Sequence, residues 1–155
     1  RGFYDALDLP ESQKSFTSLC DYRQYLDVMS QCDIAFLPLA NTHFNRMKSD
    51  LKAVEAGAHG LALLASNVVY ENSVVNGVTG ALFDNADQMK LHLQMWKRDP
   101  AGARRLGHQA REWVSTNRLA AHQVSDRYEW YQHLCEHREF LNDQLMSRVP
   151  ELVER

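Results

Sequence analysis

The sequence predicts an α/β fold, a Rossmann-like parallel sheet flanked by helices, followed by a helical C-terminal segment. Three short apolar runs carry this prediction, at residues 33–39, 61–66 and 81–83. The first is apolar at consecutive positions, which is typical of a strand buried on both faces of a parallel sheet. Segments with helical spacing separate the runs, and strands that alternate with helices are typical of βαβ units.

The first third of the chain contains one weak and two clear patterns. Residues 15–20, SFTSLC, are interpreted as a short strand. Tyr22–Cys32 is predicted to be a helix because its large side chains recur three or four residues apart. The strand DIAFLPL follows at 33–39 and leads into the polar loop ANTHFNR at 40–46.

The next helix is predicted from about Met47, and Gly60 suits its end. One face is predicted to be an apolar stripe of Met47, Leu51, Val54 and Ala58. The other is predicted to be a polar stripe of Lys48, Lys52, Glu55 and His59. The strand LALLAS and, after a loop, the strand ALF complete the sheet.

Beyond Asp84 the pattern is helical. One helix is predicted around Ala86–Trp96, a second from Pro100, and a long final helix from Val124. We therefore expect a single domain over residues 1–155, with an α/β portion at 1–84 and a helical portion at 85–155.

Composition limits the classes of function. The 155 residues are 45% apolar and 24% charged, as expected for one globular domain with a core. The net charge of −3 provides no general basic field, so no nucleic-acid partner is predicted. No apolar run approaches the roughly 20 residues that a membrane helix needs, so no transmembrane segment is predicted. The three cysteines lack CxxC spacing, which favours free thiols in a reducing cytosol.

The start of the helix near Met47 is unusual because cations gather there. A helix N-terminus is electropositive, so Arg46, Lys48 and Lys52 cost stability unless an anion binds beside them. The preceding loop lies at the carboxyl end of a predicted strand, where ligands bind in open α/β sheets. Free backbone N–H groups, with Arg46, Lys48 and Ser49, are suited to phosphate, and the carboxylate of Glu55 is suited to a ribose diol. These residues predict a nucleoside diphosphate site, and the alternative is a solvated helix face with a Lys52–Glu55 pair.

Other polar residues are candidates with simpler explanations. His43 in the first loop and Glu71 in the loop after LALLAS could contact the ligand or be plain loop residues. His133, Cys135 and His137 lie close together in the sequence, but no fourth ligand accompanies them. We therefore predict neither a metal site nor a cofactor.

The order DIAFLPL…KSDLKAVEAGAHGLALLAS…YENSVVNGVTGALF resembles the donor-binding domain of the GT-B glycosyltransferases, in their group 1 (GT4-type) branch. The resemblance implies that Glu55 matches the second Glu of the E-x7-E motif, which holds the ribose. The first Glu, implied to touch the donor sugar, is absent because Met47 stands at its position. Instead, the helix is similar to a variant with the pattern K-S-x-x-K-x-x-E, formed by Lys48, Ser49, Lys52 and Glu55.

This resemblance implies transfer of a sugar from a nucleotide-diphosphate donor to a saccharide acceptor. It also implies a retaining, hexosyl-type, metal-independent enzyme of cell-surface polysaccharide biosynthesis. The location would be cytoplasmic, with peripheral contact to the inner face of the membrane. The acceptor would be bound by an N-terminal domain outside this chain, so we expect the isolated chain to be inactive. The resemblance assigns no catalytic residue.

Two alternatives remain open at this point. A GT-B-like sugar-nucleotide epimerase would share the architecture. A non-catalytic flavodoxin-like interaction domain would need an acidic cluster at its first strand end, for which Asp5 and Asp8 are the candidates.

Overall fold

The computed structural model describes residues 2–152, which form two compact units that meet in sequence between Arg111 and Glu112. The first unit contains the sheet, and the second is helical. Each unit is described separately below.

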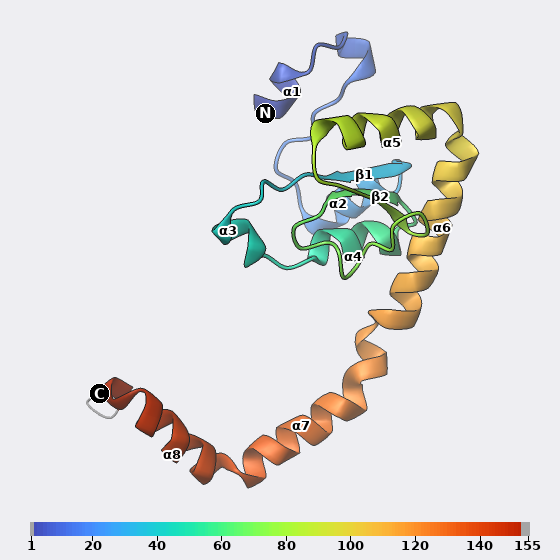
Figure 1. Ribbon diagram of the computed structural model, residues 1–155. Coiled ribbons are helices and arrows are strands. Elements are labelled where there is room, and N and C mark those ends of the chain that lie inside the picture. The colour runs from blue at the N-terminus through green and yellow to red at the C-terminus, as the bar shows by residue number, and fades with distance from the viewer. Residues whose placement is uncertain (1, 153–155) are drawn as a thin grey trace. The chain divides into compact units, whose positions relative to one another are not determined.

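The centre of the first unit is a sheet of three parallel strands (Figure 1). They are β1 (Ile34–Leu37), β2 (Ala62–Ser66) and β3 (Gly80–Phe83), in the order β1-β2-β3. Helices lie between and after the strands, which confirms the predicted α/β fold class. The strand predicted at 15–20 is wrong, because these residues form neither strand nor helix. Leu19 there is fully exposed, so the segment lacks the buried face that supports a strand.

Burial differs between the first two strands. Every residue of β2 is buried, whereas no residue of β1 is, and Phe36 is 38% exposed. The prediction that the first run is buried on both faces is therefore wrong. Within the described residues, β1 pairs with β2 along one side, and side chains cover it less completely than they cover the middle strand.

The helices of the first unit include the two that frame the candidate site, α2 (Tyr22–Met29) and α4 (Leu51–Ala58). Before α2 lie α1 (Gly2–Ala6) and the 3-10 turn η1 (Glu11–Gln13), and between β1 and α4 lies the short helix α3 (His43–Arg46). After β3 come α5 (Ala86–Arg98) and α6 (Pro100–Asn117), and the last turns of α6 belong to the second unit.

The ends of α2 and α4 have specific local causes. Asp21 caps α2 by accepting a hydrogen bond from the Gln24 amide at 2.9 Å. After α4, Gly60 adopts φ +77°, and the amide of Leu61 donates to the carbonyl of Ala56 at 3.1 Å. This is a Schellman ending, which confirms Gly60 as the helix stop.

The buried face of α4 is not the predicted apolar stripe. Met47 precedes the helix, and both Met47 and Leu51 are more than half exposed. The residues that face the sheet are Ala53, Ala56 and Gly57, all buried. Small side chains let the helix backbone approach β1 and β2 closely, so size rather than hydrophobicity decides which face packs.

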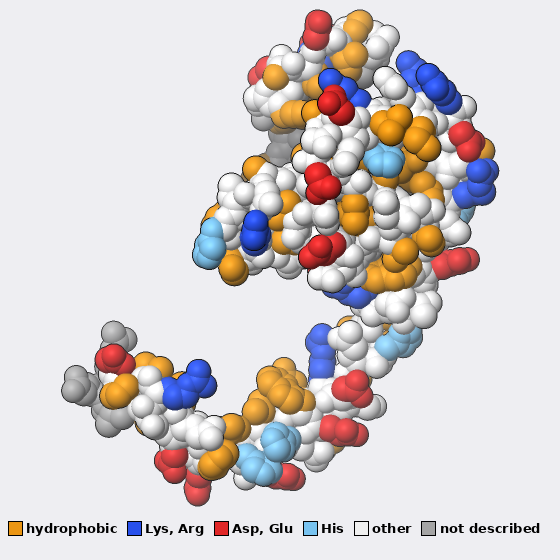
Figure 2. Space-filling view, viewed as in Figure 1, with side chains coloured by type: hydrophobic (Ala, Val, Ile, Leu, Met, Phe, Trp, Pro, Cys, Tyr) orange, Lys and Arg blue, Asp and Glu red, His pale blue; other side chains and the backbone are white. Residues whose placement is uncertain are grey.

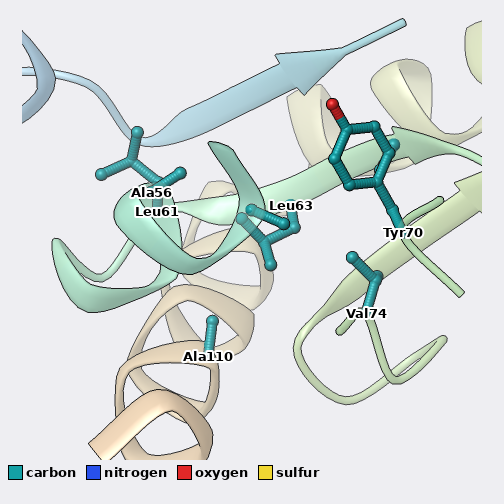
Figure 3. Packing of buried hydrophobic residues seen from close by; sticks show 8 residues of the cluster. Ala56, Leu61, Leu63, Tyr70, Val74 and Ala110 are labelled. Atoms are coloured by element: carbon teal, nitrogen blue, oxygen red, sulfur yellow. The ribbon is translucent and has the colours of Figure 1, made fainter. Parts of the chain in front are cut away.

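The core lies on both faces of the sheet because alternate residues of β2 point to opposite sides. Leu63 and Ala65 pack with Ala56 of α4, with Tyr70 and with Val74 (Figure 3). On the other face, the core residues are Ala62, Leu64, Ala81, Phe83, Trp96 and Ala103.

A buried serine joins the carboxyl ends of the first two strands. Ser66 Oγ accepts a hydrogen bond from the Leu39 amide at 2.9 Å and donates to the Leu37 carbonyl at 3.4 Å. We expect Ser66→Ala to lower the free energy of unfolding by about 1–2 kcal/mol, because the Leu39 amide loses its partner. Urea unfolding measures the loss, and Ser115→Ala, at an exposed position, should change stability by less than about 0.5 kcal/mol. Equal effects of the two substitutions would contradict this role of Ser66.

The second unit consists of the end of α6, the turn η2 (Ala120–Gln123), α7 (Val124–Glu136), α8 (Arg138–Arg148) and the turn η3 (Pro150–Leu152). The prediction of one long final helix is wrong, because the backbone of His137 (φ −104°, ψ 16°) separates α7 from α8. Neither helix buries a residue, and Tyr128, Trp130, Tyr131 and Phe140 are exposed. Figure 2 shows hydrophobic side chains on the surface of this unit. Without a packed face, continuous helical geometry gains little from tertiary contacts. Among residues 2–152, no helix combines the length and hydrophobicity that crossing a membrane requires.

Candidate functional site

The candidate site lies where α2 and α4 begin. Each helix runs antiparallel to the strand beside it, so both N-termini lie at the carboxyl edge of the parallel sheet, the usual position of ligands in this architecture. Tyr25 of α2 and the pair Lys52 and Glu55 of α4 meet there. Lys52 Nζ lies 3.2 Å from Glu55 Oε2 and donates to Tyr25 Oη at 3.2 Å. Tyr25 Oη in turn lies 3.4 Å from Glu55 Oε2.

These three side chains line a cavity of about 600 Å³. Its other wall is the irregular segment 17–21 together with two more residues of α2, so that the full lining is Thr17, Ser18, Leu19, Cys20, Asp21, Tyr22, Tyr25, Val28, Lys52 and Glu55. The rings of Tyr22 and Tyr25 lie with their centroids 6.1 Å apart. The cavity therefore combines two aromatic rings with two carboxylates, those of Asp21 and Glu55, and the ammonium group of Lys52.

The side chains of Lys52 and Glu55 differ in their exposure to solvent. The Glu55 side chain is 13% exposed, whereas that of Lys52 is 57% exposed and reaches toward solvent. The Lys52 ammonium also lies 4.5 Å from the centre of the Tyr25 ring. Partial desolvation lowers the pKa of Lys52, but hydrogen bonds to Tyr25 and Glu55 outweigh it and raise the pKa overall. Lys52 is thus a cation throughout the neutral range, and Glu55 keeps an acceptor oxygen beside the cavity.

The segment between β1 and α4 does not form the helix start that the sequence suggested. Residues 43–46 form the short helix α3, capped by the Thr42 hydroxyl at 3.2 Å from the Asn45 amide. Lys52 lies in the first turn of α4, whereas Arg46 and Lys48 precede that helix. Arg46 Nε donates to Asn41 Oδ1 at 2.7 Å, and Lys48 Nζ lies 5.1 Å from the centre of the Phe44 ring. These contacts hold the two cations at the surface. Of the three predicted cations, Lys52 is therefore the one that lies at the electropositive N-terminus of α4.

The structure therefore separates the seven predicted site residues into two groups. Lys52 and Glu55 line the cavity. His43, Arg46, Lys48 and Ser49 are exposed in the segment that follows β1, and Glu71 is exposed in the loop that follows β2. All seven lie toward the carboxyl edge of the sheet, and a hydrogen bond from Ser73 to the Asp50 carboxylate joins the two loops.

Sequence patterns did not identify Tyr25 or segment 17–21 as parts of the site. Tyr25 fits the apolar periodicity of α2, and its hydroxyl is the feature that distinguishes it from a core residue. Residues 15–20 were interpreted as a strand. Segment 17–21 borders the same cavity as Lys52 and Glu55, which lie about thirty positions later in the sequence.

A flavodoxin-like acidic site and a histidine metal site have no support in the geometry. Asp5 lies in α1 and Asp8 in the irregular segment after it, so neither follows a strand as a flavodoxin-like acidic site requires. His133 and His137 bring their rings to a centroid distance of 4.2 Å, but in residues 2–152 no three His, Cys, Asp or Glu side chains gather as a metal site needs.

Comparisons with known proteins agree with this architecture. A family model described as glycosyl transferase-like matches residues 8–132. The solved structure of sucrose-phosphate synthase from Thermosynechococcus elongatus superposes with a TM-score of 0.64 over 81% of this chain, at 24% sequence identity. The match covers 31% of that longer chain. No curated protein has a significantly matching sequence.

Proposed function

The chain belongs to the glycosyl transferase-like family, and we propose that it is the part of a glycosyltransferase that binds the nucleotide-sugar donor. The family match confirms the predicted resemblance to glycosyltransferases. The observation that carries the proposal is the position of Glu55, whose largely buried carboxylate borders a cavity of about 600 Å³. That volume lies within the range of small-molecule sites, and its aromatic and polar lining is typical of them.

In this proposal Glu55 accepts hydrogen bonds from the two hydroxyl groups of the ribose. A carboxylate is an acceptor with two oxygens, so it suits a vicinal diol better than a neutral side chain does. Tyr25 now occupies part of this acceptor capacity at 3.4 Å, a long contact that a ribose hydroxyl can replace. The base would lie in the cavity against Tyr22 and segment 17–21.

The diphosphate would lie at the start of α4. The free amide groups of a helix N-terminus attract anions, and the ammonium of Lys52 adds a positive charge there. Arg46, Lys48, Ser49 and His43 are exposed in the adjoining segment, and Glu71 is exposed in the neighbouring loop. On binding, the long side chains of Arg46 and Lys48 would exchange their contacts with Asn41 and Phe44 for a diphosphate oxygen.

The chemistry that we propose is transfer of a hexosyl group to a saccharide acceptor with retention of configuration, without metal or cofactor. Cations and amide groups would stabilise the departing diphosphate, so no general base is required for the leaving group. The acceptor would be bound by another domain, and the product would belong to a cell-surface polysaccharide made on the cytoplasmic side of the membrane. The composition of the site supports metal independence, because Lys52 supplies the charge that a divalent ion would otherwise provide.

The test is an NMR titration of the labelled protein with UDP, GDP, CDP and ADP at millimolar concentrations. We expect one of them to shift resonances of segment 17–25 and of residues 48–55. The same titration in EDTA and in Mg²⁺ should give equal affinities. Shifts with no nucleotide, or shifts confined to the second unit, would contradict the proposal.

A further inference from the structure

A second cavity lies in the first unit, on the face of the sheet opposite to α4. It has a volume of about 510 Å³ and is bordered by α5, by α6 and by the start of β3. Figure 1 shows α5 and α6 meeting at a corner beside the sheet. The apolar part of its lining includes Ala81, Trp96 and Leu106, which belong to the core on this face. The lining shares no residue with the cavity beside Lys52 and Glu55, so the two cavities are separate.

Polar side chains from three segments share this lining. They are the amides of Asn76 and Gln109, the imidazole of His92 and the ion pair of Asp99 with Arg105. In the part of the chain that the structure describes, the side chains of His92 and Gln109 make no hydrogen bond. The side chain of Asn76 uses its oxygen alone, which accepts from a backbone amide of β3 at 3.1 Å. Because an amide and a neutral imidazole each contain a donor and an acceptor, the cavity can both donate hydrogen bonds to a ligand and accept them.

The charges along this lining balance. Arg105 Nη2 lies 3.2 Å from Asp99 Oδ2, so each charge has a partner of opposite sign. The start of α6 would attract an anion, but Asp99 Oδ1 already accepts a hydrogen bond from the Gly102 amide there at 2.8 Å. Neither a phosphate nor a metal cation therefore gains much from this place. The cavity suits a neutral ligand.

The apolar part of the lining limits the class of neutral ligand further. The Trp96 side chain lines the cavity although only 8% of the residue is exposed, and Met95 lines it beside Trp96. The ring of His92 lies 6.4 Å from that of Trp96, so a polar group adjoins the apolar surface. A ligand that matches this lining has an apolar face and an edge of groups that both donate and accept. A pyranose ring has both, because its C–H groups form an apolar face and each hydroxyl donates and accepts.

We propose that this cavity is a binding site for a neutral saccharide. The C–H face of a sugar ring would pack against Trp96 and Met95, and its hydroxyl groups would form hydrogen bonds with Asn76, His92 and Gln109. The volume lies within the range of small-molecule sites. A saccharide held here does not contact Lys52 or Glu55, so it is anchored to the protein rather than placed for reaction. This inference does not depend on the proposed donor site.

The test is an NMR titration of the labelled protein with maltotriose, cellotriose, tri-N-acetylchitotriose and mannotriose at millimolar concentrations. We expect at least one trisaccharide to shift the indole resonance of Trp96 and the amides of residues 76–81 and 102–109. Residues 17–25 and 48–55 should not shift. Glucose and glucose 6-phosphate form a matched pair for charge, and the phosphate ester should bind at this cavity no more tightly than glucose.

A double variant tests the polar groups of the lining. His92→Ala combined with Gln109→Ala removes two of them, and we expect about tenfold weaker binding of the preferred trisaccharide, the effect of losing two hydrogen bonds between neutral groups. The matched control combines Gln94→Ala with His108→Ala, at exposed positions of the same two helices outside the lining. It removes the same two kinds of side chain and should keep the affinity. All four positions are helical, where alanine is favourable, so both variants should remain folded.

Several results would overturn the saccharide site. They are the absence of shifts at this cavity with every trisaccharide, tighter binding of glucose 6-phosphate than of glucose, and equal affinities in the two double variants. Shifts of residues 76–81 and 102–109 by a nucleoside diphosphate would also overturn it, because the cavity would then take a charged ligand. The donor site is judged separately, by the shifts that nucleotides cause in residues 17–25 and 48–55.

Discussion

Replacing Gly107 with alanine is expected to lower the free energy of unfolding by about 3 kcal/mol or more. Gly107 is buried in α6, where the helix crosses the loop that ends α4. A Cβ atom at this position would overlap the carbonyl oxygen of Gly60 and lie 3.1 Å from the amide nitrogen of Ala62. Both obstacles are backbone atoms, and Gly60 is fixed by its positive φ, so neither can move without displacing the start of β2.

The matched control is Gly102→Ala in the same helix. There the Cβ atom would meet the side chain of Asp99, a group near the surface that can shift, although it accepts a hydrogen bond from the Gly102 amide at 2.8 Å. Alanine has a better helix propensity by roughly 1 kcal/mol, which offsets the roughly 1 kcal/mol lost with that cap, so this variant should lose much less stability than Gly107→Ala. Denaturant unfolding of both variants measures the difference. If Gly107→Ala were as stable as Gly102→Ala, the close approach of α6 to Gly60 would be wrong.

Replacing Glu55 with glutamine is expected to weaken binding of the preferred nucleoside diphosphate by about 10- to 100-fold. Hydrogen bonds to a charged acceptor contribute roughly 1.5–3 kcal/mol, and the amide of glutamine keeps one neutral acceptor oxygen in the same place. The folded state should lose little, because the Lys52 partner of Glu55 is more than half exposed and such pairs contribute about 1 kcal/mol or less. Titration calorimetry or NMR shifts measure the affinity.

Two controls make the result specific to the ribose. Asp27→Asn, on an exposed position of α2 outside the cavity lining, removes the same charge and should leave the affinity unchanged. The 2′-deoxy form of the nucleotide should bind the unsubstituted protein more weakly, yet bind Glu55→Gln about as well as the ribonucleotide does. If the two losses simply add, Glu55 does not contact the 2′-hydroxyl.

Several features follow from local sequence patterns. The strands at 34–37, 62–66 and 80–83 are short apolar runs, and the helices that follow them have the 3.6-residue period, so the parallel sheet was predictable. Gly60 ends α4 as predicted, because a left-handed residue after a helix is a local preference of glycine. Lys52 and Glu55 lie three residues apart in a helix, so their adjacency needs no tertiary information.

Other local patterns were overruled by the rest of the fold. The stripe from Met47 to Ala58 suggested an earlier helix start, but α4 begins at Leu51. It buries Ala53, Ala56 and Gly57, because close packing on the sheet favours small side chains. SFTSLC has strand-forming residues without a neighbouring strand, and it forms a wall of the cavity instead. The sequence from Val124 is continuous in its helical period, yet α7 and α8 are separate helices. Among the described residues neither helix buries a side chain, so tertiary packing does not favour one continuous helix.

The sequence by itself determined the α/β class, the position of the sheet and the charged pair on α4, since each depends on residues within a few positions of one another. The tertiary structure decided that Tyr25 meets Glu55 across thirty residues, and that Gly107 lies against Gly60. Periodicity and local preference carry no information on such pairs, because contacts of this kind form only when separate elements pack together.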